Sequence, residues 1–97
     1  MAVVTRYTVH FSGHVQGVGF RYTVVHIARS YAAAGYVQNL SDGRVKLVAE
    51  GQPADLDSLV DQIARQMERY VTSHTLDKSA ASGEFGRPAA DGIAVRY

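Results

Sequence analysis

The order of hydrophobic and polar residues in the first half of the chain predicts a strand, a helix and a hairpin. Residues 7–12 alternate between apolar and polar, the period of a strand with one buried face. From Phe20 the apolar residues recur at helical spacing, and Gly35, after an alanine-rich stretch, is predicted to be the left-handed residue that ends this helix. Asp42-Gly43 lies between two strand-like runs, which is typical of a β-hairpin. The two strands of the hairpin are predicted at 36–40 and 44–50.

The second half has weaker signals, which predict a helix followed by two short strands. Gln52-Pro53 opens a second helix with two aspartates near its start, and its apolar face consists of Leu56, Leu59, Val60, Ile63, Met67 and Tyr70. Short strands are predicted at 71–76 and 93–97, separated by a long loop at 79–92. The order β-α-β-β-α-β predicts the ferredoxin-like α+β fold, an antiparallel sheet with both helices on one face. We expect one domain, residues 1–97, and leave open the register of the last two strands and the role of the loop.

Composition excludes several classes of protein. The 97 residues include ten basic and nine acidic side chains, a net charge of +1, so charge gives no reason to expect a nucleic acid or an anionic membrane as a partner. The absence of cysteine excludes a disulfide framework and a thiol nucleophile. Residues 1–11 are unlike a signal peptide, and no segment approaches the roughly 20 apolar residues that span a bilayer. We therefore expect a cytoplasmic protein, of undetermined oligomeric state.

The entry to the first helix, residues 13–21, breaks two rules of helix formation together. No Ser, Thr, Asp or Asn precedes Phe20 to cap the helix, and the cation Arg21 lies in its first turn, where the helix dipole disfavours positive charge. An anion bound in this loop would remove both faults, because free N–H groups, glycines and a guanidinium together form a phosphate-binding site. The alternative is a glycine-rich turn that serves only tight packing, beside an exposed arginine. The loop matches neither the dinucleotide-binding nor the Walker A pattern.

These residues resemble a known family. The run Gly13-His14-Val15-Gln16-Gly17-Val18-Gly19-Phe20-Arg21, followed by residues 35–45 and by Glu50-Gly51, is similar to both signatures of the acylphosphatases. The resemblance implies hydrolysis of the carboxyl-phosphate bond of small acyl phosphates to a carboxylate and inorganic phosphate, with no metal or other cofactor. It also implies that Arg21 is the phosphate-binding catalytic arginine and that Asn39 orients the attacking water. The backbone of Val15, Gln16, Gly17, Val18, Gly19 and Phe20 would bind the phosphoryl oxygens, and inorganic phosphate would inhibit as the product.

The chemistry of an acyl phosphate suits this small set of residues. The leaving group is a carboxylate with a pKa of about 4, so it needs no general acid. No dense set of acidic residues and no paired histidines at ligand spacing indicate a metal site. His14 lies inside the loop, where it either touches substrate or is a solvated side chain, whereas structural roles are expected for His10, His26 and His74.

Two other functions remain as alternatives to the hydrolase. The first is a non-catalytic phosphate-binding or anion-binding ferredoxin-like module, which has no need of a water-orienting amide at Asn39. The second is an RNA-binding sheet with the same order of elements. It is the weakest alternative, because the strand predicted at 44–50 contains no aromatic residue on which a base could stack.

Overall fold

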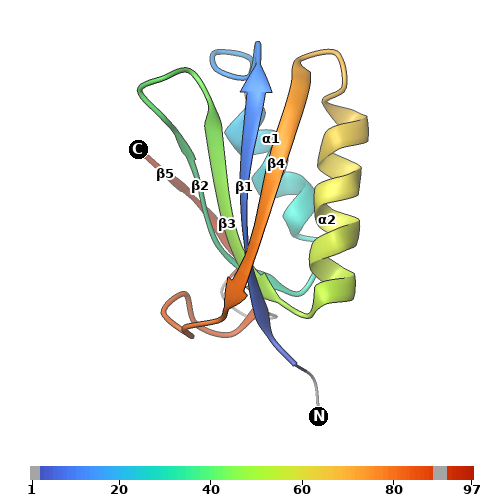
Figure 1. Cartoon of the computed structure of the whole chain (residues 1–97), viewed down its shortest axis with the longest axis vertical. Helices are drawn as coiled ribbons and strands as arrows, with labels where there is room; N and C mark the ends of the chain where they lie inside the picture. The colour runs from blue at the N-terminus through green and yellow to red at the C-terminus, as the bar shows by residue number, and fades with distance from the viewer. Residues whose placement is uncertain (1–2, 89–91) are drawn as a thin grey trace.

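The computed structural model describes residues 3–88 and 92–97 and shows a five-stranded sheet with two helices (Figure 1). The elements are β1 (Thr5–Gly13), α1 (Phe20–Ala28), β2 (Ala33–Asn39), β3 (Val45–Gly51), α2 (Pro53–Gln66), β4 (Val71–Ala80) and β5 (Ile93–Arg96). The strand order is β4-β1-β3-β2-β5. None of the helices in these residues is long and apolar enough to cross a membrane. The predicted ferredoxin-like fold is confirmed.

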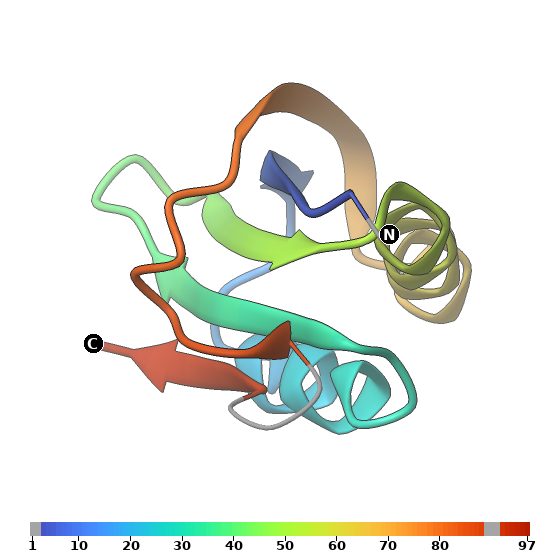
Figure 2. The ribbon, with the colours of Figure 1, turned by 90° about the horizontal axis from the view of Figure 1, so that it is seen from below.

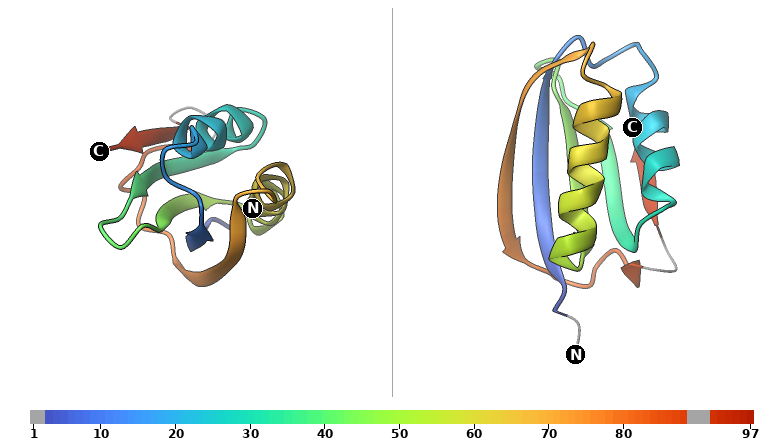
Figure 3. Two further views of the ribbon diagram at one scale, coloured as in Figure 1. Left: turned by 90° about the horizontal axis from the view of Figure 1, so that it is seen from above. Right: turned by 90° about the vertical axis from the view of Figure 1, so that its right-hand side faces the viewer.

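Both helices pack on one face of the sheet, which Figure 3 shows in its right-hand view. Strand β1 has the predicted alternation, because Tyr7, Val9 and Phe11 are buried against the helices while their neighbours face outward. The hydroxyl of Tyr7 donates to Asp57 at 2.7 Å, and this hydrogen bond connects α2 to β1. The acidic residue in the first turn of α2 is Asp55. The core therefore lies between one sheet face and two helices.

The sheet is mixed, and the expectation of an antiparallel sheet is wrong at one edge. Strand β5 pairs with β2 in parallel, whereas the pairs β1·β3, β1·β4 and β2·β3 are antiparallel. Strand β4 ends at the lower end of the sheet in Figure 1, and the chain then passes to the far edge and runs back upward as β5. This crossing makes β5 parallel to β2.

The first helix is shorter than its apolar pattern predicts. It ends at Ala28, and Gly35 is a residue of β2 rather than the left-handed residue after a helix. Ala33 and Ala34 are fully buried in this strand, so burial in the sheet overrides the helix propensity of alanine. A Cβ atom at Gly35 would lie 1.9 Å from the main-chain oxygen of Val48. The glycine is needed for the close approach of β2 to β3.

The segment after β4, residues 81–88, is attached to the sheet face opposite the helices. Figure 2 shows it passing outside the sheet from β4 toward β5. The Glu50 carboxylate accepts hydrogen bonds from the backbone N–H groups of Ser82 at 2.8 Å and Gly83 at 3.0 Å, and from Arg6 Nε at 2.9 Å. The ring of Phe85 contacts the edge of Tyr36, with centroids 5.6 Å apart. Residues 79 and 80 of the predicted loop at 79–92 therefore belong to β4, residues 81–88 cover part of the sheet, and 89–91 lie outside the described residues.

Candidate active site

The 13–19 loop that joins β1 to α1 is held by apolar anchors at its two ends. Val15 and Phe20 are buried in the core, and the rings of Phe11 and Phe20 are 5.2 Å apart. Gly17 and Gly19 are exposed and have φ angles of +78° and +75°. Open space surrounds both positions, so the left-handed backbone rather than crowding requires glycine there. The loop therefore buries its apolar side chains and exposes its main chain.

The two irregularities expected at the start of α1 are present. Its N-cap residue is Gly19, no side chain caps the helix, and no acidic residue lies in its first turn. Within the described chain, the backbone N–H groups from Val15 to Phe20 donate to no other residue. Thr23 braces the loop instead, because its N–H and its hydroxyl both donate to the oxygen of Gly19 at 3.0 Å. The N-terminal end of α1 therefore has backbone N–H groups that can donate to a bound ligand.

Arg21 and Asn39 lie at one pocket with this loop. The pocket has a volume of about 120 Å³ and is lined by Val15, Gly17, Gly19, Phe20, Arg21, Tyr22 and Asn39. Arg21 lies in the first turn of α1, and Asn39 is the last residue of β2. Because β1 and β2 run in the same direction, their carboxyl ends meet at one end of the sheet, which is the upper end in Figure 1. This topology brings Asn39 beside a loop more than 20 residues earlier in the chain.

Gln16 and Val18 do not line this pocket. Val18 packs against the core. The Gln16 side chain donates through Nε2 to the main-chain oxygens of Leu40 at 2.7 Å and Arg44 at 3.0 Å. It therefore connects the 13–19 loop to the β2–β3 hairpin that follows Asn39. The predicted hairpin is confirmed, with Asn39 opposite Val45 in the antiparallel ladder.

Two tyrosines at the site had no signal in the sequence pattern. Tyr22 lines the pocket, and its hydroxyl shares a hydrogen bond of 2.5 Å with the hydroxyl of Tyr97. The guanidinium of Arg21 lies over the ring of Tyr97, 4.8 Å from the centroid, and Arg21 Nη1 donates to the oxygen of Arg96 at 3.4 Å. The hydrogen bond with Tyr22 raises the pKa of Tyr97, and burial acts in the same direction. The separation of 75 residues explains why local patterns could not show these contacts.

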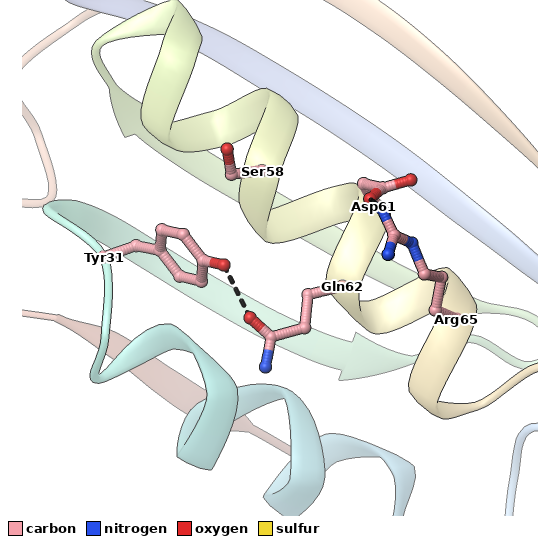
Figure 4. Close-up of a pocket in the computed structure, with 5 residues that line it drawn as sticks. All are labelled: Tyr31, Ser58, Asp61, Gln62 and Arg65. Carbon is pink, nitrogen blue, oxygen red and sulfur yellow. Dashed lines mark hydrogen bonds and ion pairs between the residues drawn. The ribbon is translucent and has the colours of Figure 1, made fainter.

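A second hollow, about 350 Å³ in volume, lies between the end of α1 and α2 (Figure 4). It is lined by Tyr31, Ser58, Asp61, Gln62 and Arg65. Four of its side chains already pair with each other: Tyr31 donates to Gln62 Oε1 at 2.5 Å, and Arg65 pairs with Asp61 at 2.5 Å. This hollow contains neither Arg21 nor Asn39, the two residues for which the sequence predicts a catalytic role. The smaller pocket is therefore the candidate active site because of its residues and not because of its size.

None of the four histidines lines the pocket. His14 is exposed and does not line the pocket, and its backbone N–H donates to the oxygen of Tyr70 at 2.9 Å. The ring of His74 lies 5.7 Å from that of Phe11. In residues 3–88 and 92–97, no group of three or more His, Asp or Glu side chains is placed to hold a metal ion.

Comparison with known proteins gives consistent matches. The acylphosphatase family model matches residues 7–87. An acylphosphatase of Paenarthrobacter aurescens (strain TC1) is 42% identical over 81 residues, covering 82% of this chain and 86% of that protein. The crystal structure of acylphosphatase from Bacillus subtilis has a TM-score of 0.81 at 32% identity, covering 96% of this chain and 99% of that one. An acylphosphatase structure from Coxiella burnetii has a TM-score of 0.81 at 28% identity, covering 97% and 94% of the two chains.

Fold and site together describe a ferredoxin-like α+β domain with an arginine and exposed backbone N–H groups at the carboxyl ends of two parallel strands. The chain belongs to the acylphosphatase family. Its function is that of an acylphosphatase, a hydrolase that acts on an acid anhydride, and the alternative of a non-catalytic anion-binding module is not favoured.

Proposed function

We propose that the 13–19 loop, Arg21 and Asn39 hydrolyse the carboxyl-phosphate bond of small acyl phosphates without a metal ion. The observation that carries this assignment is the meeting at one pocket of about 120 Å³ of the guanidinium, the amide and loop N–H groups that donate to no residue of the described chain. Its volume is below the roughly 300 Å³ at which pockets for drug-sized ligands begin. A site of this size suits the phosphoryl group, with the acyl group outside it.

The backbone N–H groups from Val15 to Phe20 and the Arg21 guanidinium bind the phosphoryl oxygens. Positive charge and fixed donors at a helix N-terminus stabilise the negative charge of this group. Arginine offers two parallel N–H groups to two phosphoryl oxygens, which a lysine ammonium cannot reproduce. Substrate charge therefore replaces the missing helix cap, and inorganic phosphate is held by the same donors as a product and competitive inhibitor.

Asn39 orients the attacking water. Its amide carries both a donor and an acceptor and no charge, so it can fix a water molecule without repelling the anionic substrate. In the reaction a bond forms between the water oxygen and phosphorus, and the bond from phosphorus to the carboxyl oxygen breaks. The bonding pair leaves with the carboxylate. One proton of the water passes to a phosphoryl oxygen, and the other stays on the oxygen that is now bonded to phosphorus. Catalysis then rests on positioning and electrostatic stabilisation, as is general for phosphoryl transfer.

The test is hydrolysis of acetyl phosphate in excess chelator, with inorganic phosphate as inhibitor. We expect Asn39→Ala to lower kcat about 10²- to 10³-fold while the phosphate inhibition constant changes less than about threefold. Arg21→Lys should weaken phosphate binding as well as turnover. Arg65→Lys, a matched change at the other pocket, should have no effect. Loss of activity in chelator with recovery in Mg²⁺ would refute the metal-free mechanism, and near-normal kcat in Asn39→Ala would remove Asn39 from it.

The same measurements separate the hydrolase from an anion-binding module. A module would bind phosphate through Arg21 but leave acetyl phosphate intact. Cytoplasmic location and the absence of nucleic-acid and membrane partners stay predictions from the sequence.

A further inference from the structure

We propose that Tyr97 is a positioning residue for Arg21, and that Tyr22 fixes Tyr97 in place. This inference rests on the proposed function, since it assigns Arg21 to the phosphoryl group. Its first support is the way Arg21 is held. In the part of the chain that the structure describes, Arg21 forms no ion pair with a carboxylate, and its guanidinium lies over the ring of Tyr97 instead.

An arginine that binds an anion needs a neutral support. A carboxylate partner would occupy the N–H groups of the guanidinium and repel the phosphoryl group. The face of an aromatic ring attracts the cation through its quadrupole and leaves the N–H groups in the guanidinium plane free. The Tyr97 ring, with its centroid 4.8 Å from Arg21 Cζ, supplies this support, and the oxygen of Arg96 accepts one long hydrogen bond of 3.4 Å.

Tyr97 could not position another side chain unless it were fixed itself. It is 82% exposed, so packing alone does not hold it. Two polar contacts do so: its hydroxyl shares the 2.5 Å hydrogen bond with Tyr22, and its main-chain oxygen accepts from Gln38 Nε2 at 3.4 Å. Because Tyr22 follows Arg21 directly, the contacts form a closed ring of Arg21, Tyr22 and Tyr97.

Exposure of the two tyrosines also calls for an explanation. Tyr22 is 60% exposed, and with Tyr97 it is one of two exposed aromatic residues in residues 3–88 and 92–97. Tyr22 lines the pocket, Tyr97 contacts Arg21, and the two tyrosines bond to each other, although neither contributes to the core. Because the hydrogen bond raises the pKa of Tyr97, the hydroxyl stays protonated at neutral pH and the contact persists there. A role at the site accounts for this placement.

The experiment measures binding of inorganic phosphate by titration calorimetry, so its result does not depend on turnover. Tyr97→Leu should raise the phosphate Kd about three- to tenfold, because the cation loses its ring contact and gains rotational freedom. Tyr97→Phe and Tyr22→Phe should each give a smaller, equal increase, since each removes the same hydrogen bond. Tyr31→Phe, which removes a tyrosine hydrogen bond at the other pocket, should leave the Kd unchanged.

A double-mutant cycle distinguishes positioning from a general structural effect. In the Arg21→Lys background, Tyr97→Leu should change the phosphate Kd less than about 1.5-fold, because the guanidinium is no longer there to be positioned. An unchanged Kd for Tyr97→Leu in the parent chain would overturn the inference and leave the proposed function intact. Tighter phosphate binding by Tyr97→Leu would overturn the inference as well, since Tyr97 would then hold Arg21 away from the phosphate. Failure of the parent chain to bind phosphate would refute the proposed function and this inference together.

Discussion

Replacement of Glu50 by glutamine should destabilise the fold without impairing the active site. Glu50 is 1% exposed and is the buried charged side chain of the described residues. Its Oε2 accepts from Arg6 Nε, the Ser82 N–H and the Ser82 hydroxyl, and its Oε1 accepts from the Gly83 N–H. A glutamine that keeps the three donors on its oxygen must turn its NH2 group toward the N–H of Gly83. One donor then faces another, and the bond to Arg6 loses its charge assistance.

The magnitude follows from these contacts. A buried hydrogen bond to a charged group contributes about 1.5–3 kcal/mol, a neutral one about 1 kcal/mol, and an unsatisfied buried donor costs about 1–3 kcal/mol. We expect Glu50→Gln to lower the free energy of unfolding by about 2–4 kcal/mol, a large share of the stability of a small domain. Glu84→Gln is the matched control, because Glu84 also pairs with Arg6 but its side chain is 56% exposed. The control should cost less than about 1 kcal/mol.

The assay is urea unfolding at a series of pH values. Burial raises the pKa of Glu50, but the hydrogen bonds from Ser82, Gly83 and Arg6 outweigh it and leave the pKa below its usual range. A carboxyl group with a lowered pKa in the folded state stabilises the fold above its unfolded pKa of about 4.3, and this contribution is lost as pH falls through the folded pKa. The gap between parent and Glu50→Gln should therefore be full at pH 7 and shrink below pH of about 4. A gap that is independent of pH would refute the reasoning.

Two further variants test the strand contact and the loop. Gly35→Ala should lower the free energy of unfolding by about 3 kcal/mol, because its Cβ would lie 1.9 Å from a main-chain oxygen. Gly43→Ala is the control: it has open space around it and should cost only about 1–2 kcal/mol, for its positive φ. Equal costs of the two variants in urea unfolding would contradict this. Gln16→Ala removes two hydrogen bonds between the 13–19 loop and the hairpin and should lower kcat/KM about tenfold. An unchanged kcat/KM for acetyl phosphate would show that the hairpin does not need this connection.

Local signals made the hairpin and the start of α1 predictable. The Asp42-Gly43 turn places both strands of the hairpin, because the turn depends on its own residues: Arg44 bonds back to Asp42 through its N–H and its side chain. The start of α1 was also recognisable, since an uncapped helix with an arginine in its first turn conflicts with helix physics in the sequence itself. These are the places where neighbours in the chain decide the structure.

Tertiary contacts decided what the sequence could not predict. The alanine-rich stretch before Gly35 favours a helix locally, yet it becomes strand because Ala33 and Ala34 are buried between neighbours. Strand β4 extends to Ala80, beyond the predicted end at 76, although most of its side chains are exposed, because pairing with β1 rather than burial sustains it. The contacts of Glu50 with Ser82 and of Arg21 with Tyr97 join distant parts of the chain, so neither has a local pattern.

The positions of these contacts explain how the loop can leave its donors unpaired. Arg6, which bonds to Glu50, and Gly13, which opens the 13–19 loop, lie at opposite ends of β1, about 23 Å apart at about 3.3 Å per residue. Gly17 and Gly19 are exposed to solvent and adopt positive φ without strain, so the open helix end costs little. Val15 and Phe20 hold it on the core, whereas the contacts that fix the 81–88 segment act at the far end. The contacts of Glu50 and the anion site therefore lie at opposite ends of the sheet.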